Sequence, residues 1–194
     1  MLGSIRTALW NILLFTVVTG ILYPLLVWGI GIGFMPWQAR GSLVERNGLV
    51  VGSLRIGQNF HSPEYFQGRP SMTGGSPYNP MASGGSNYAC GNPAQEDSVR
   101  LRRKNLCFWN DCGPGEPPAE LLEASASGLD PEITLSAALF QVKRIARARK
   151  IKETGLVALI YGNAIPPLLD IFGTERVNVL QLNLTLDRKF GKEN

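Results

Sequence analysis

The stretch TALWNILLFTVVTGILYPLLVWGIGIGFMPWQA, residues 7–39, contains no Asp, Glu, Lys or Arg. Its densest part, Leu9 to Phe34, exceeds the roughly 20 apolar residues that cross a hydrocarbon core about 30 Å thick. Because that core holds no water to satisfy backbone N–H and C=O groups, a single span has to be a helix. The run therefore predicts a transmembrane helix over residues 7–35, after a short N-terminus, 1–6, and before a soluble domain, 36–194.

Aromatic and proline residues support this interpretation of the apolar run. Trp10 lies near one end, and Trp28 and Trp37 lie near the other, as expected for rings at the headgroup level. Pro24 lies inside the run and is expected to kink the helix. A cleaved signal peptide has a shorter apolar core, and soluble core helices rarely extend this far without a charge, so a retained membrane anchor is favoured.

The orientation of the span is left open by charge alone. Arg6 precedes the span, whereas Arg40, Arg46 and Arg55 follow it, which would place the large domain inside the cell. The positive-inside rule applies to short loops, however, and long domains cross membranes largely regardless of charge.

Composition limits the partners of the soluble part. The formal net charge of +4 is mild, and no basic stretch interleaved with aromatics is present, so no nucleic acid is expected as a partner. Cys90, Cys107 and Cys112 lack metal-ligand spacing. Cys107 and Cys112 are either free thiols or, in an oxidising compartment, a small disulfide loop.

A hairpin and a long loop follow the span. Asn47-Gly48 between two apolar runs predicts a β-hairpin over residues 43–51, and residues 53–57 continue the strand pattern. From Gln58 to Pro93 no helical or strand periodicity is present, but aromatic residues are interleaved throughout. Because disordered segments are poor in aromatics, this stretch is expected to be an ordered loop and the functional surface of the soluble domain.

Helices are expected in the second half of the chain. Residues 95–104 predict a short basic helix, and residues 107–118 a surface loop. Asp130 before Pro131 predicts a helix start, with Thr134 as a second candidate cap.

The helix that starts there is expected to run to about Ile151 with its apolar positions on one face. Its basic residues are expected on the other sides, and they are Lys143, Arg144, Arg147 and Lys150. Residues 153–161 predict a further helix. At the C-terminus, alternating leucines fit a strand, but Asn178 with Gln181 fits a capping box, which favours a helix.

The sequence offers no catalytic residues and no metal site of its own. The only histidine, His61, has Glu64 as its one nearby carboxylate, which gives little support to a membrane-anchored hydrolase. The Ser83–Ser86 stretch, Ser-Gly-Gly-Ser, is either an anion nest or a tight loop that needs positive φ at Gly84 and Gly85.

Several motifs, in order along nearly the whole chain, resemble the C subunit of bacterial Kdp potassium-transporting ATPases, the KdpC family. They are GSL at 41–43, IGQNF at 56–60, YFQGRPS at 65–71, YNP at 78–80, ASGGSN at 82–87, ASASGLDP at 124–131, VNV at 177–179 and LNL at 182–184.

The resemblance implies a single N-terminal transmembrane helix with one loop-rich α+β extracytoplasmic domain in the bacterial inner membrane. The subunit would be a non-catalytic part of a high-affinity, ATP-driven potassium import complex. Its partners would be a channel-like subunit, a P-type ATPase subunit and membrane lipid. The family is also described as a catalytic chaperone that raises the ATP affinity of the ATPase subunit, so ATP is expected only through the complex, with no firmly bound cofactor.

The resemblance also suggests site residues. The expected partner-docking residues are Gln58, Asn59, Phe60, Tyr65, Arg69, Pro70, Tyr78, Asn79 and Pro80. The candidate nucleotide-binding residues are Ser83, Gly84, Gly85, Ser86 and Asn87, and their alternative setting is a nucleotide-binding module that faces the cytoplasm. The segment from Glu96 to Pro118 departs from the family pattern, which has an Ala-rich helix and linker there.

Overall fold

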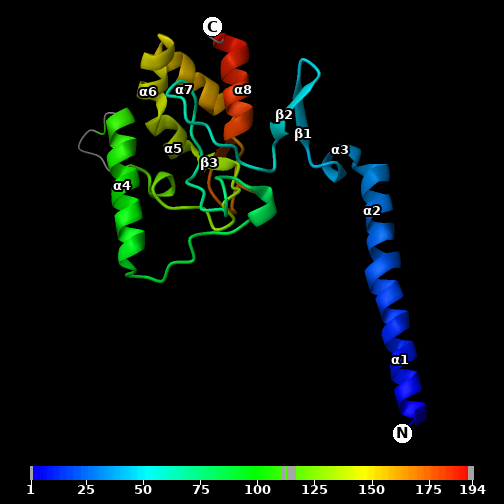
Figure 1. The fold of residues 1–194 in the computed structure, drawn as a ribbon. Helices are drawn as coiled ribbons and strands as arrows, with labels where there is room; N and C mark the ends of the chain where they lie inside the picture. The colour runs from blue at the N-terminus through cyan, green and yellow to red at the C-terminus, as the bar shows by residue number, and fades with distance from the viewer. Residues whose placement is uncertain (1, 111, 113–116, 192–194) are drawn as a thin grey trace. The chain divides into compact units, whose positions relative to one another are not determined.

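The computed structural model describes residues 2–110, 112 and 117–191, and it forms two compact units, Met1–Val51 and Gly52–Asn194 (Figure 1). In the first unit, α1 (Leu2–Val17), a π-helical turn (Val18–Leu22) and α2 (Tyr23–Phe34) form one continuous rod. Within the described residues, Gly3–Phe34 is the one helix long and apolar enough to cross a membrane, and its most apolar window buries no residue inside the chain.

The π-helical turn lies directly before the proline of the span. Pro24 has no N–H to donate to the carbonyl four residues earlier, so the regular α-helical pattern is interrupted at this point. The distortion expected at Pro24 therefore takes the form of a wider turn over Val18–Leu22.

A short helix and a hairpin follow the rod. After α3 (Pro36–Ala39), β1 (Leu43–Arg46) pairs with β2 (Leu49–Ser53). Asn47 and Gly48 connect the strands with φ of 54° and 77°, which confirms the predicted hairpin turn. The strand predicted beyond Ser53 is wrong, because the backbone turns there.

The core of the second unit is a helical layer on a small antiparallel sheet. β3 (Glu132–Thr134) pairs with β4 (Arg176–Asn178), with Ile133 opposite Val177. Helix α7 (Glu153–Gly162) packs against α5 (Leu135–Phe140), α6 (Val142–Arg149) and α8 (Val179–Phe190). The fully buried large side chains of the unit include Phe66, Ile133, Ile145, Leu156, Ile160, Leu182 and Leu186.

The predicted helix start at Asp130 is wrong, and the second candidate is confirmed. Residues 132–134 form β3 because they pair with β4, and the helix begins only at Leu135. The Thr134 side chain accepts the N–H of Ala137 and caps the helix. The single helix expected to reach Ile151 is divided at Gln141 into α5 and α6.

Helix α4 (Pro93–Asn110) is longer than predicted, since Cys107–Asn110 continue the helix. The loop predicted for residues 107–118 therefore begins later, and residues 111 and 113–116 lie outside the described part. At the C-terminus the helical interpretation is confirmed. Asn178 Oδ1 accepts the Gln181 N–H at 3.0 Å and caps α8.

Candidate docking site

Two buried side-chain amides hold the long loop against the helices. Asn183 of α8 donates to the Phe66 carbonyl at 2.9 Å and accepts the Phe66 N–H at 2.8 Å. Gln141 accepts the Gln67 N–H at 2.8 Å and donates to the Gln67 carbonyl at 3.0 Å. Each amide thus pairs with the loop backbone as a neighbouring strand would, which confirms that the loop from Gln58 to Pro93 is ordered.

Arg144, expected on a solvated face, is instead buried beneath the loop. Its Nη1 donates to the carbonyls of Pro63 at 2.6 Å and Tyr65 at 3.0 Å. Its Nη2 donates to Gln141 Oε1 at 2.6 Å, and its Nε donates to Asn110 Oδ1 at 3.0 Å. Burial lowers the pKa of Arg144 to about 10, so the guanidinium is still charged at neutral pH.

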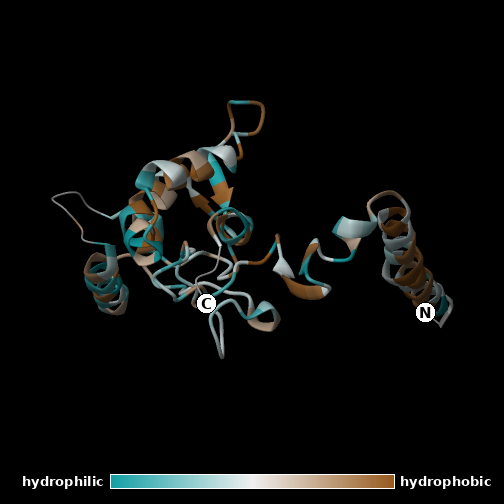
Figure 2. Ribbon diagram, turned by 90° about the horizontal axis from the view of Figure 1, so that it is seen from above, coloured by the Kyte–Doolittle hydropathy of each residue, from teal (hydrophilic) through white to brown (hydrophobic). Residues whose placement is uncertain are grey.

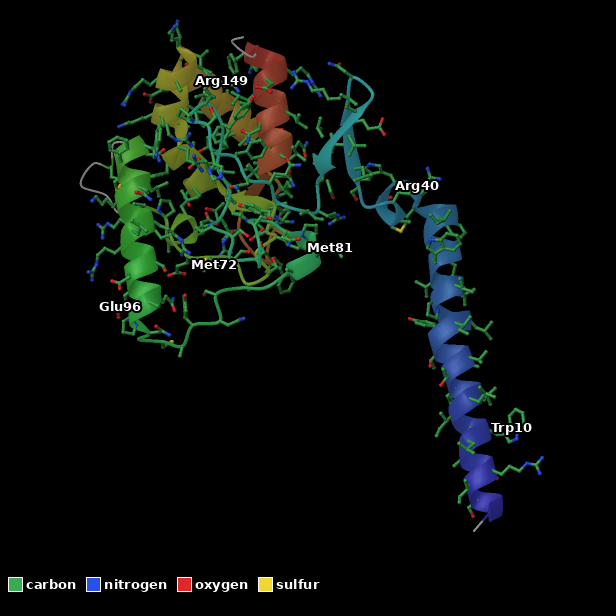
Figure 3. All side chains as sticks on the ribbon, in the orientation of Figure 1. Trp10, Arg40, Met72, Met81, Glu96 and Arg149 are labelled. Carbon is green, nitrogen blue, oxygen red and sulfur yellow. A yellow bond between two sulfur atoms is a disulfide. The ribbon has the colours of Figure 1, made fainter. Side chains whose placement is uncertain are left out.

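Arg149 makes the second buried attachment of the loop and is labelled in Figure 3. Its guanidinium donates to the Glu64 carbonyl at 2.9 Å and pairs with Asp187 at 2.7 Å, and both paired side chains are only 6% exposed. The Tyr65 ring lies 4.7 Å from Arg149 Cζ, and its hydroxyl donates to Asp187 at 3.1 Å. Burial, followed by the Asp187 charge, raises the pKa of Tyr65. Tyr65 therefore contacts the buried Arg149–Asp187 ion pair that holds the loop.

A hollow of about 550 Å³ lies between the loop and α4. Six of the nine expected docking residues line it, and they are Gln58, Asn59, Phe60, Arg69, Pro70 and Tyr78. Tyr65, Asn79 and Pro80 do not. The tertiary structure thus brings most of the expected docking residues to one surface depression.

Arg69 is positioned at the hollow by a partly exposed ion pair. Its Nη1 lies 3.3 Å from Asp130 Oδ2, and the two side chains are 27% and 31% exposed. Arg69 Nε is buried and has no hydrogen-bond partner among the described residues. Asp130, expected to cap a helix, thus orients a cation at the hollow.

Tyr78 shapes the floor of the same hollow. Its hydroxyl donates to the Arg69 carbonyl at 2.5 Å, and its N–H donates to Ser71 Oγ at 2.8 Å. The ring occupies space that only glycine leaves free, since a Cβ on Gly57 would collide with it and a Cβ on Gly68 would lie 2.7 Å from its hydroxyl oxygen. Burial, with the charge of the nearby Asp130 as the second cause, raises the pKa of Tyr78 to about 12, so the hydroxyl stays protonated as a donor.

Asn79 and Pro80 build a turn outside the hollow. Asn79 Oδ1 accepts the Met81 N–H at 3.0 Å, and its Nδ2 donates to the Gly74 carbonyl at 2.9 Å. Pro80 begins the 3-10 turn Pro80–Ala82, which leaves Met81 91% exposed; Figure 3 labels this side chain. Asn79 therefore fixes the conformation of the loop next to the hollow, and Pro80 starts the 3-10 turn that follows.

The Ser-Gly-Gly-Ser loop uses its glycines differently from the prediction. Neither Gly84 nor Gly85 has a positive φ, which is found instead at Asn87 (52°). Glycine is needed at 85 because a Cβ there would lie 2.9 Å from the Ala126 carbonyl oxygen. The Gly84 N–H donates to the Ser127 carbonyl at 2.9 Å, so one donor of the suggested anion nest is already occupied.

The remaining candidates are the hydrolase residue, a metal site and the three cysteines. His61 lines the hollow, and within the described residues no hydrogen bond joins it to Glu64. No group of metal-ligating side chains is found in the part of the chain that the structure describes. Cys107 and Cys112 form a disulfide, and Cys90 is an exposed free thiol.

Sequence reasoning missed the wall of the hollow that comes from α4. Arg102, Asn105, Leu106 and Trp109 line it from this helix. Their spacing of three and four residues places them on one helix face, which is the signal that could have identified them. They lie in the segment that departs from the family pattern.

The family of the chain follows from its similarity to known proteins. The family model KdpC, K+-transporting ATPase, c chain, matches residues 5–188. The chain belongs to the KdpC family. The potassium-transporting ATPase KdpC subunit of Janthinobacterium sp. (strain Marseille) is 46% identical over 189 residues, which cover 97% of this chain and 100% of that protein. The KdpC subunit of Escherichia coli (strain SMS-3-5 / SECEC) is 43% identical over 187 residues, which cover 96% and 98%.

Membership of the KdpC family confirms the resemblance and gives the general role. The chain is an accessory subunit of a potassium-transporting ATPase complex. The candidate membrane-spanning helix near the N-terminus agrees with a subunit of a membrane transport complex.

Proposed function

We propose that this KdpC-family chain assembles and stabilises a high-affinity potassium import complex in the bacterial inner membrane without performing catalysis itself. Its partners are the channel-like subunit that passes potassium and the P-type ATPase subunit. The hollow between the loop and α4 carries the proposal, because it gathers six of the expected docking residues on a rigidly held surface. The apolar helix, whose most apolar window buries nothing inside the chain, supplies the anchor and lipid contact.

The chemistry of the hollow suits docking of a protein segment. Phe60, Tyr78 and Trp109 contribute aromatic surface, and Arg69 and Arg102 contribute positive charge. No carboxylate side chain is present among the described residues that line it. Aromatic residues and arginine dominate binding energy at protein interfaces, so the fitting partner is a segment with apolar and acidic side chains.

We further infer that any effect on ATP affinity is exerted on the ATPase subunit through the assembled complex. The Gly84 N–H, which a phosphate nest would need, is bonded to Ser127, and Gly85 packs against Ala126. This packing supports a bracing role for the Ser-Gly-Gly-Ser loop rather than direct phosphate binding.

Replacing Trp109 with alanine tests the docking role of the hollow. Trp109 lines the hollow, whereas its neighbour Phe108 does not, although the two rings contact each other at 5.7 Å between centroids. Trp109→Ala should reduce recovery of the other subunits with the tagged chain by on the order of tenfold after purification in mild detergent. Phe108→Ala loses the same ring contact and should leave recovery unchanged. Equal recovery with both variants would contradict the assignment of the hollow.

The soluble unit is proposed to face the extracytoplasmic side. The Cys107–Cys112 disulfide supports this orientation, because disulfides persist in oxidising compartments such as the periplasm. Cys90, an exposed free thiol, then provides a direct test. A membrane-impermeant maleimide should label the wild-type chain but not Cys90→Ser in intact spheroplasts. Labelling of wild-type only after lysis would reverse the orientation.

A further inference from the structure

A small apolar hairpin projects from the second unit between α7 and β4. Its base is fixed by two hydrogen bonds between Ile165 and Arg176, at 2.7 and 3.1 Å, which extend the pairing of β4. Nearer the tip, Leu168 and Phe172 exchange two further hydrogen bonds, each 3.0 Å long. The hairpin is therefore mounted rigidly on the sheet, and its apolar tip is visible as a projecting brown loop in Figure 2.

Four large apolar side chains cluster at this tip in water. Leu168, Leu169, Ile171 and Phe172 are 67%, 75%, 76% and 64% exposed. Isolated exposed apolar residues are ordinary, but a contiguous group of this size on a soluble unit marks an interaction surface. The tip lies outside the set of residues that line the hollow.

The turn itself adopts a conformation that folding alone does not favour. Leu169 and Asp170 have φ of 54° and 57°, and the Ile171 N–H donates to the Leu168 carbonyl at 3.3 Å. Positive φ at both central positions describes a type I′ turn, for which Asn and Gly are the preferred residues. A leucine is costly in this region, and the Leu169 side chain is 75% exposed, so burial of this side chain does not offset the cost.

The charges around the tip select the kind of surface that can cover it. Between the paired residues Ile165 and Arg176 the chain carries two acidic residues, Asp170 and Glu175, and no Lys or Arg. Arg176, at the base, forms an ion pair with Glu132 at 2.6 Å. Within the described part of the chain, no ion pair is formed by Asp170. A carboxylate at the apex of the tip is costly to place in hydrocarbon, so insertion of the tip into lipid is disfavoured. A protein cleft with a basic side chain can satisfy both the apolar and the acidic groups.

We propose that the hairpin Leu168–Phe172 inserts into an apolar cleft, bordered by a basic side chain, on another subunit of the potassium-transporting ATPase complex. It is a second contact, separate from the hollow, and it rests on the proposed assembly function. Because hydrogen bonds already hold the hairpin, its insertion should cost little conformational entropy. The apolar surface buried on binding would come from the exposed leucines and Phe172.

Photo-crosslinking from the tip tests which surface covers it. Leu169 is replaced by p-benzoyl-phenylalanine in the full chain, which is expressed together with the other subunits and irradiated in native membranes. The expected product is an adduct with another subunit of the complex. An adduct with lipid alone, an adduct with a second copy of this chain, or no adduct would each overturn the proposal. The same replacement at Met81, which is 91% exposed, is the matched position and should give no subunit adduct.

Substitutions separate this inference from the assembly function. Leu169→Ser/Phe172→Ser should reduce recovery of the other subunits on the order of tenfold, with the unfolding midpoint of the purified chain unchanged. Met81→Ser/Leu101→Ser removes two exposed apolar side chains elsewhere and should have no effect. Asp170→Lys should reduce recovery of the other subunits more than Asp170→Asn.

If wild-type recovers the subunits and the tip variants do so equally well, the hairpin inference fails alone. If wild-type recovers none, the assembly function fails.

Discussion

Replacing Arg144 with leucine is expected to lower the free energy of unfolding of the second unit, Gly52–Asn194, by about 3–5 kcal/mol. The guanidinium supplies four hydrogen bonds to groups from three separate parts of the chain, namely Asn110, Gln141 and the carbonyls of Pro63 and Tyr65. Leucine would leave these acceptors without their donor in a site that is 3% exposed. The gain from no longer burying a charge offsets only part of this loss, because several acceptors are stranded together.

Denaturant titration of the full chain in mild detergent measures this effect. Trp109 is the only tryptophan after residue 37, so it contributes the fluorescence change of the second unit. Lys143→Ala, an exposed neighbour on the same helix, is the control and should change stability by less than about 0.5 kcal/mol. Arg144→Lys should be intermediate, since one ammonium cannot reach all four acceptors. An unaltered midpoint for Arg144→Leu would show that the loop does not depend on this side chain.

Replacing Asp187 with asparagine is expected to cost about 3 kcal/mol, because it leaves the buried Arg149 guanidinium without its counter-charge. The substitution keeps the shape of the side chain, so packing is largely preserved. The two side chains lie 2.7 Å apart and are each 6% exposed, which leaves little access for water to solvate the charge. The single acceptor oxygen of asparagine cannot serve both Arg149 and the Tyr65 hydroxyl, so the attachment of the loop near Glu64 should weaken locally.

A double variant distinguishes the lost counter-charge from lost packing. Arg149→Met/Asp187→Leu removes both charges. Its loss of stability should be smaller than the summed losses of the single variants Arg149→Met and Asp187→Leu. The same fluorescence titration measures all four proteins of the cycle. Additive losses would mean that the pair contributes no coupling energy, and the proposed role of the ion pair would then be wrong.

Local sequence patterns predicted those elements whose stability depends on neighbours along the chain. The apolar run, the Asn47-Gly48 hairpin and the Asn178 cap of α8 are all recovered in the structure. Each rests on a property that a few adjacent residues supply, such as positive φ at a turn or a side-chain oxygen near free N–H groups. The expected docking residues have a different source, since they came from the family resemblance, and their docking role remains a prediction.

Long-range pairing explains the predictions that failed. Glu132–Thr134 became a strand because β4, more than forty residues away, supplies its partner, so Asp130 could not start a helix. Arg144 was assigned to a solvated face because a charged residue is rarely buried alone. Its partners lie in the loop and in α4, and helical periodicity carries no information about either.

The sequence by itself determined the long apolar helix, the hairpin after it, the caps at Thr134 and Asn178, and membership of the KdpC family. Only the tertiary structure decided where the loop from Gln58 lies, which of its residues share a hollow with α4, and that the apolar tip at Leu168–Phe172 is left exposed. The physical reason is that the former depend on conformational preferences within a few residues. The latter depend on which distant groups satisfy buried hydrogen bonds and cover apolar surface, and those partners exist only once the chain has folded.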